Sequence, residues 1–133
     1  MKSSPKVGIL ISGRGSNMEA LLKAEKENKL PGEIVVIISN NPDAKGIQTA
    51  RRYGKSVEVI PHTNFETREQ HEEAIYNTLR KYNVSHVILA GYMRILTKYL
   101  VTKYKNRMIN IHPSLLPSFP GLNAQKQALV YGV

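Results

Sequence analysis

A hydrogen-bond donor and a proton carrier stand two residues apart late in the sequence, in Asn110-Ile-His112. An extended strand alternates its side chains, so Asn110 and His112 point to the same side. A carboxamide can donate a hydrogen bond to a developing oxyanion, and an imidazole can carry a proton near neutral pH. The pair therefore predicts a centre at which a carbonyl carbon is attacked. The alternative is that both side chains only bond to backbone groups of the loop.

A second candidate is the glycine-containing loop Ser12-Gly-Arg-Gly-Ser-Asn17, placed between an apolar run and a helical pattern. Its glycines permit a sharp turn, and the amides at a helix N-terminus attract phosphate. Met18 stands where a dinucleotide fingerprint has its third glycine, and the loop lacks the Gly-Lys-Ser/Thr of a nucleoside triphosphate loop. The loop therefore favours a mononucleotide or a sugar phosphate, and an ordinary strand-to-helix turn is the alternative.

The segment Gly91-Tyr-Met-Arg-Ile-Leu96 follows another apolar run. Met93, Ile95 and Leu96 could line an apolar pocket for a flat ring. Backbone groups would then contact the polar edge of that ring. Packing of the same side chains in the protein core is the alternative interpretation.

These candidates have to be positioned by elements that alternate along the chain. Strands are expected over 7–11, 34–38, 57–60, 86–90 and 108–111. Helices are expected from a cap at Ser16 to Leu30, over 44–53, 65–82 and 97–104, with another over 124–131. The alternation predicts an α/β fold, a Rossmann-like and mostly parallel sheet with helices on both faces. Ligands bind such sheets beyond the carboxyl ends of the strands, where all three candidate segments begin.

Composition and charge narrow the possible functions. The 133 residues suit one domain, and the absence of Cys excludes disulfides, cysteine–zinc sites and thiol nucleophiles. No apolar run is long enough to cross a membrane, so we expect a cytoplasmic protein without a membrane partner. All ten carboxylates precede residue 74, whereas eight of the 19 Lys and Arg residues follow it. Such a basic half is compatible with solvated faces, anionic ligands or nucleic acid. We expect His62, His71 and His86 to be surface or packing residues.

Three separated motifs together resemble the phosphoribosylglycinamide formyltransferases. They are Ile11-Ser-Gly-Arg-Gly-Ser-Asn17, Gly91-Tyr-Met-Arg-Ile-Leu96 and Asn110-Ile-His-Pro-Ser-Leu-Leu-Pro117 followed by Phe119-Pro-Gly-Leu122. The resemblance runs from about Val7 to Gly132. The related methionyl-tRNA formyltransferases share the Asn-x-His and Ser-Leu-Leu-Pro core but lack the Ser-Gly-x-Gly-Ser-Asn loop. The combination therefore indicates the glycinamide ribonucleotide branch.

The resemblance implies formyl transfer from 10-formyltetrahydrofolate, as cosubstrate, to the amine of glycinamide ribonucleotide in purine synthesis. It implies small-molecule partners, no nucleic acid and no metal. The substrate phosphate would be held by Gly15, Ser16 and Asn17. The folate would be contacted by Arg68, by Met93, Arg94, Ile95 and Leu96 around its pterin ring, and by Asn110. Asn110 would also stabilise the oxyanion, and His112 would be the acid–base residue.

The sequence departs from the family pattern in its last part. The family has a catalytic Asp well downstream of the Asn-x-His pair, whereas this sequence has no carboxylate after Glu73. The family's closing strands and C-terminal helix are missing too, and Asn123 and Gln125 stand where many members have His. We therefore expect 1–133 to be a single but incomplete formyltransferase N-terminal domain, with little or no activity alone. The alternatives are a catalytically inactive fragment and a basic phosphate- or RNA-binding module.

Overall fold

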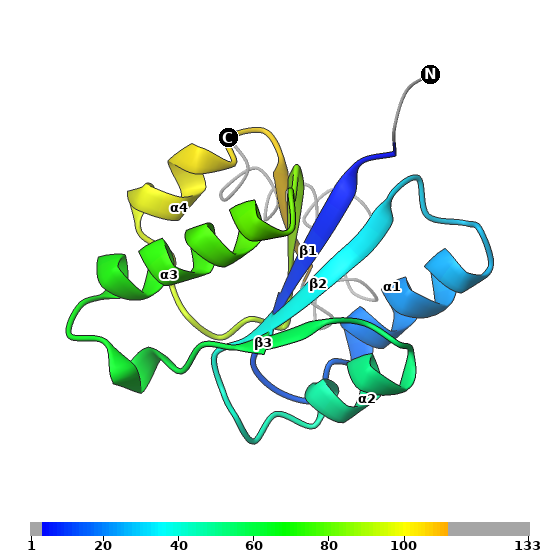
Figure 1. Cartoon of the computed structure of the whole chain (residues 1–133), viewed down its shortest axis with the longest axis horizontal. Coiled ribbons are helices and arrows are strands. Elements are labelled where there is room, and N and C mark those ends of the chain that lie inside the picture. The colour runs from blue at the N-terminus through cyan, green and yellow to red at the C-terminus, as the bar shows by residue number, and fades with distance from the viewer. Residues whose placement is uncertain (1–3, 112–133) are drawn as a thin grey trace, which may run out of the picture.

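The protein forms a five-stranded, fully parallel sheet in a computed structural model that describes residues 4–111 (Figure 1). The strand order is β3-β2-β1-β4-β5. The strands are β1 (Lys6–Ile11), β2 (Glu33–Ser39), β3 (Val57–Val59), β4 (His86–Ala90) and β5 (Met108–Ile111). The predicted Rossmann-like fold is confirmed, and all five predicted strands are present within one residue of their expected bounds.

The helices lie on both faces of this sheet, as predicted (Figure 1). One face carries α1 (Ser16–Lys26) and α2 (Gly46–Arg52), and the other carries α3 (Arg68–Lys81) and α4 (Lys98–Lys103). A short 3-10 helix, η1 (His62–Asn64), precedes α3. The predicted helix over 124–131 lies outside the described residues. In the described range, no helix is long and apolar enough to cross a membrane.

The two largest differences from the predicted helix bounds, in α1 and α3, have identifiable reasons. The first ends at Lys26 rather than at Leu30, because Asn28 adopts a left-handed conformation with φ of 59°. Leu30 fits the helical spacing but packs against the core from the turn that follows. The third helix begins at Arg68, where Thr67 and Gln70 form a reciprocal capping box. Phe65 therefore lies before this helix rather than on its inner side.

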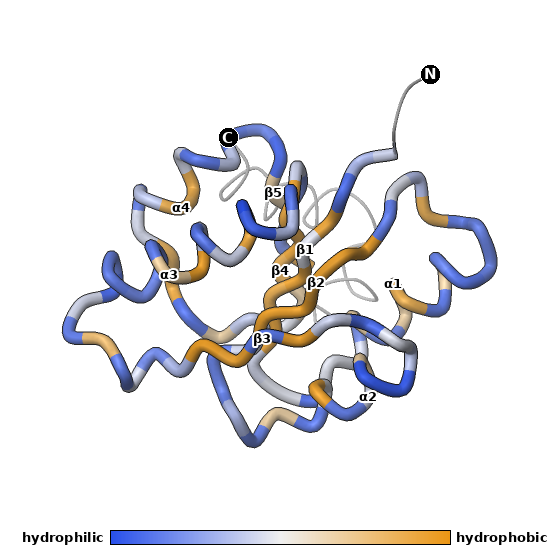
Figure 2. The backbone as a smooth tube through the Cα atoms, in the orientation of Figure 1, coloured by the Kyte–Doolittle hydropathy of each residue, from blue (hydrophilic) through white to orange (hydrophobic). Residues whose placement is uncertain are grey.

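The apolar strands are buried on both faces, which explains why their sequences are continuous apolar runs. On one side, Leu10, Val36 and Leu89 pack with residues of α3 and α4, including Ile75. The opposite faces of these strands pack against α1 and α2. Figure 2 shows this apolar centre as an orange band through the strands, with hydrophilic segments around it.

A buried carboxylate fixes the helix that follows β4. Glu72 of α3 is 2 % exposed and accepts three hydrogen bonds from the start of α4. The donors are the Thr97 amide at 2.6 Å, the Thr97 hydroxyl at 2.8 Å and the Leu100 amide at 3.1 Å. Amides at a helix N-terminus lack partners within the helix, so a carboxylate there satisfies them and interacts favourably with the helix dipole. Glu72 thereby joins α4 to α3.

Close backbone packing joins the turn after β1 to the start of α2. The Gly46 amide donates to the Gly13 carbonyl at 3.0 Å. A Cβ at Gly46 would lie 2.7 Å from Cδ1 of Ile11 and 3.2 Å from the carbonyl oxygens of Gly13 and Arg14. Only glycine therefore permits this approach, and the turn after β1 rests directly on α2.

We expect Glu72→Ala to lower the free energy of unfolding by about 3 kcal/mol, because three donors, of which the Leu100 amide is buried, lose their acceptor. Chemical denaturation measures the loss. Glu73→Ala removes an exposed carboxylate from the same helix and is expected to change stability by less than about 0.5 kcal/mol. Equal effects of the two substitutions would contradict the role given to Glu72.

Gly46→Ala is expected to destabilise the fold by about 1–3 kcal/mol through overpacking against Ile11 and the turn after β1. The matched control is Gly13→Ala, because a Cβ at Gly13 would have no atom within 4 Å. Thermal unfolding of both variants provides the comparison. A Gly46→Ala protein as stable as the Gly13→Ala protein would show that the approach is not tightly constrained.

Candidate functional site

The carboxyl ends of the parallel strands gather the candidate segments at one edge of the sheet. The turn after β1 begins at Ser12, the turn after β2 at Asn40, and the segment after β4 at Gly91. Because β1 is paired with both β2 and β4, these three connections are neighbours. This edge is where ligands bind in such sheets, as the sequence predicts.

The loop predicted to hold phosphate leads directly into α1. Gly15 is the N-cap, with φ of 74°, and no side chain caps the helix. The prediction that Ser16 is the cap is therefore wrong, because the left-handed turn at Gly15 makes Ser16 the first helical residue. Ser16 is exposed and Asn17 is half-buried. The amides of the first turn and these two side chains together form a group of donors suited to an anion.

The backbone of the segment 91–97 is bonded to the turn after β1 and, at two points, to α3. The Met93 amide donates to Oγ of Ser12 at 2.8 Å, and the Ile95 carbonyl accepts from the Arg68 guanidinium at 3.1 Å. The Thr97 amide donates to Glu72. This segment is thus anchored at its beginning, middle and end.

The side chains of this segment divide into two groups. Met93 and Ile95 are 77 % and 68 % exposed, which is unusual for large apolar residues in an ordered segment. Leu96 instead packs against the core next to α3 and α4. Core packing, the alternative interpretation, therefore applies to Leu96, whereas Met93 and Ile95 present apolar surface to solvent.

Arg94 lies near two buried titratable groups. His71, on α3, is 3 % exposed, and its Nε2 lies 2.7 Å from the carbonyl oxygen of Ile60. Burial lowers the pKa of His71, and the positive charge of Arg94 lowers it further. Burial also disfavours the charged form of Tyr92 and so raises the pKa of its hydroxyl, which has no hydrogen-bond partner among the described residues. His71 is thus the packing residue that the sequence predicts.

Asn110 lies on β5 one position before its end. It is paired with Leu89 of β4 and is 6 % exposed, whereas Ile109 is 49 % exposed. Asn110 therefore lies on the buried side of β5. His112, its predicted partner in the chemistry, lies outside the described residues, so its distance from Asn110 is not given by the structure.

Three polar side chains at the same edge are linked by hydrogen bonds, a connection that the sequence does not predict. The Ser12 hydroxyl donates to Oδ1 of Asn40 at 2.5 Å, and Nδ2 of Asn40 lies 3.1 Å from Nδ1 of His62. Ser12 and Asn40 are both buried. His62 is therefore more than a surface residue, because it has a carboxamide partner. The available signal was a polar residue immediately after each of two apolar strands.

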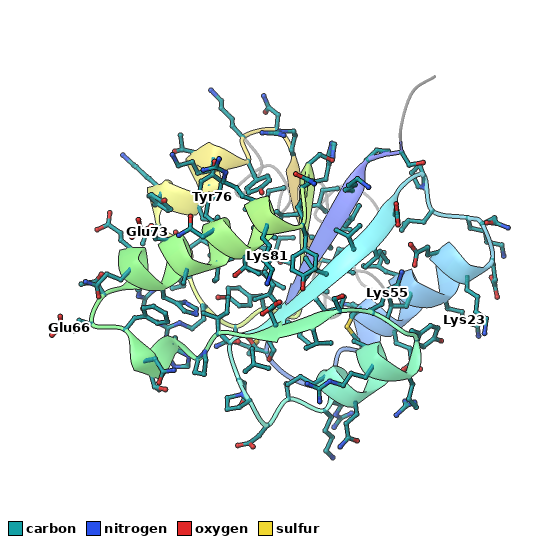
Figure 3. The ribbon with its side chains drawn as sticks, in the orientation of Figure 1. Lys23, Lys55, Glu66, Glu73, Tyr76 and Lys81 are labelled. Carbon is teal, nitrogen blue, oxygen red and sulfur yellow. The ribbon has the colours of Figure 1, made fainter. Side chains whose placement is uncertain are left out.

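The basic residues of α3 and α4 lie against tyrosine rings rather than apart from them. Lys103 is 5.2 Å from the ring centre of Tyr76 and 5.3 Å from that of Tyr99, and Arg80 is 5.7 Å from Tyr76. Tyr76 also meets Tyr99 and Tyr104 edge to face. It projects from α3 on the side toward α4 (Figure 3). These rings are already occupied by the protein's own cations and aromatics, an arrangement that stabilises the helix pair.

Two of the surface pockets in the described part of the chain have no predicted site residue in their lining. One, of about 450 Å³, is bounded by α1, the end of α2 and Lys55. The other, of about 620 Å³, lies along the turn after β2 and the outer side of α2. Among residues 4–111, no group of three or more His, Asp and Glu residues is arranged to hold a metal ion.

Comparison with curated proteins gives close matches over nearly the whole chain. The chain is 41 % identical over 124 residues to the phosphoribosylglycinamide formyltransferase of Escherichia coli, covering 93 % of this chain and 58 % of that protein. It is 44 % identical over 129 residues to the trifunctional purine biosynthetic protein adenosine-3 of Chironomus tentans, covering 96 % of this chain and 9 % of that protein. The chain thus spans less than two thirds of these relatives.

Solved structures give the same result for the fold. The glycinamide ribonucleotide transformylase 1 of Symbiobacterium toebii aligns with a TM-score of 0.81 and 43 % identity, over 98 % of this chain and 61 % of that one. The phosphoribosylglycinamide formyltransferase of Brucella melitensis aligns with a TM-score of 0.80 and 42 % identity, over 99 % and 68 %. The sequence profile of the formyl transferase family matches residues 5–133. The chain belongs to the formyl transferase family.

Proposed function

We propose that this protein transfers a formyl group from 10-formyltetrahydrofolate to the amine of 5'-phosphoribosylglycinamide, a step of purine biosynthesis. The observation that carries the proposal is the direct bond from the Met93 amide to Ser12 at 2.8 Å. The bond supports the proposal because it joins a turn whose donors suit an anion to a segment with exposed apolar side chains, as a reaction between a phosphorylated substrate and a flat-ring cosubstrate requires. The names of the relatives support the same reaction.

The phosphorylated substrate would bind at the start of α1. Gly15, Ser16 and Asn17 present amides, a hydroxyl and a carboxamide there, and the positive end of the helix dipole favours a dianion. The turn rests on Gly46 of α2, so its backbone is held in place before the ligand arrives. A preorganised turn loses less entropy on binding.

The folate cosubstrate would bind along 91–97. The exposed side chains of Met93 and Ile95 would pack against the pterin ring. The resemblance also assigns Arg94 and Leu96 to the contacts with this ring. Arg68 bonds to the Ile95 carbonyl, so it both supports this segment and places a positive charge beside it. That charge suits the carboxylates of a folate glutamate tail.

The chemistry then needs one hydrogen-bond donor and one proton carrier. The substrate amine attacks the formyl carbon, giving a tetrahedral centre with a negative oxygen, and the bond from that carbon to N10 of the folate breaks. Asn110 would donate to the oxygen, while His112 would take the amine proton and return a proton to N10. No metal is required, the partners are small molecules rather than nucleic acid, and the cytoplasm is the setting that such substrates suit.

We expect Asn17→Ala and Ser16→Ala each to weaken glycinamide ribonucleotide binding about tenfold, because each removes one polar contact to phosphate. Calorimetric titration with the ribonucleotide measures this, and titration with a folate analogue is expected to be unchanged. Asn77→Ala, which removes an exposed carboxamide from α3, serves as the control. Unchanged ribonucleotide affinity in both site variants would contradict the assignment.

In the full-length protein, Asn110→Ala is expected to lower kcat for formyl transfer about 100-fold or more, because the oxyanion loses its donor. His112→Ala is expected to have a loss of similar size, since proton transfer contributes about 10²–10⁴-fold. Affinity for a folate analogue should remain largely unchanged in both. Full turnover by either variant would remove that residue from the mechanism.

A further inference from the structure

A continuous series of hydrogen bonds runs from η1 to the segment after β4. His62 contacts Asn40, Asn40 contacts Ser12, and Ser12 accepts from the Met93 amide. The series crosses three connections at the carboxyl edge of the sheet, those after β1, β2 and β4. It therefore joins the turn that leads to the anion-binding residues with the segment that carries the exposed apolar side chains.

The direction of each bond follows from the chemistry of the groups. Ser12 has one hydroxyl proton, which it donates to Oδ1 of Asn40, and its oxygen accepts from the Met93 amide. Nδ2 of Asn40 consequently faces His62, and an amide nitrogen only donates. Nδ1 of His62 must therefore accept. This arrangement requires a neutral imidazole with its proton on Nε2.

We propose that neutral His62 is a positioning residue for the formyl-transfer site. It holds the Asn40 amide in the orientation that receives the Ser12 proton, and Ser12 in turn fixes Met93 beside the anion-binding turn. The inference rests on the proposed function for its catalytic meaning. The hydrogen-bonded series itself depends only on the described residues.

A proton added to Nδ1 would place two donors opposite each other. The Asn40 amide would then have to turn, so that Nδ2 faced Ser12 and the hydroxyl proton of Ser12 lost its acceptor. The titratable and charged groups around this position are His71 of α3, 6.2 Å from His62 between ring centres, with Glu72 and Arg94 next to His71. A proton on Nδ1 would therefore weaken the link to Met93.

Two substitutions separate the hydrogen bond from the rest of the side chain. His62→Ala removes the acceptor, whereas His62→Asn keeps an acceptor at the same distance from the backbone as Nδ1 and removes the titration. His86→Ala is the matched control, because His86 lies at the start of β4, at the other end of the strands. Affinity for a folate analogue is expected to fall about tenfold in His62→Ala and to recover in His62→Asn.

The pH dependence supplies a readout that a purely structural role would not change. Affinity for the folate analogue should fall more steeply on acidification in the wild-type protein than in His62→Asn, which has no imidazole at this position. Identical pH profiles of the two proteins would overturn the proposal. So would an affinity in His62→Ala equal to that of the wild type.

Nuclear magnetic resonance tests the same assignment without any ligand. The ¹⁵N shifts of His62 should show Nδ1 unprotonated at neutral pH, and exchange of the Met93 amide should accelerate in His62→Ala but not in His86→Ala. A protonated Nδ1, or unchanged Met93 exchange, would overturn the positioning role. If the wild-type protein bound no folate analogue, the proposed function would fail, while these two measurements would still decide whether His62 positions Met93.

Discussion

The buried carboxylate of Glu72 is the interaction on which the site's second half depends. A carboxylate this deeply buried is stable only when its oxygens are well bonded, and here three donors from the start of α4 provide those bonds. Because both oxygens are bonded to the start of α4, the end of the 91–97 segment has one position relative to α3. The bonds from Ser12 to Met93 and from Arg68 to Ile95 then set the beginning and the middle.

The first half of the site depends instead on the absence of side chains. Gly15 turns the backbone into the left-handed region, and Gly46 lets the turn after β1 lie on the backbone of α2. Ser12 belongs to both halves, because its backbone starts this turn and its hydroxyl oxygen accepts from Met93. The two halves therefore differ in kind: one is held by a bonded charge, and the other by close backbone contact.

Much of this arrangement was predictable from local sequence, and the reasons are physical. Continuous runs such as Ile34–Ile38 indicate strands buried on both sides, and their alternation with helices fixes a parallel sheet whose carboxyl edge binds ligands. The end of α1 was predicted wrongly because Leu30 keeps a helical spacing although the backbone turns at Asn28. The sequence predicts Ser16 as the cap because Gly15, which caps the helix with positive φ, has no side chain to indicate that role.

The contacts between elements were not predictable in the same way. Glu72 is one of four carboxylates between Glu66 and Glu73, and only the position of α4 distinguishes it as buried. The meeting of Ser12, Asn40 and His62 likewise depends on β1 lying beside β2.

The strand order has a further consequence for folding. Val7 of the central strand pairs with His86, 79 residues later in the chain. One of the two edges of β1 therefore stays unpaired until β4 is available. Such distant contacts slow folding, and the edge that unites 12–17 with 91–97 therefore forms only after most of this chain has been synthesised.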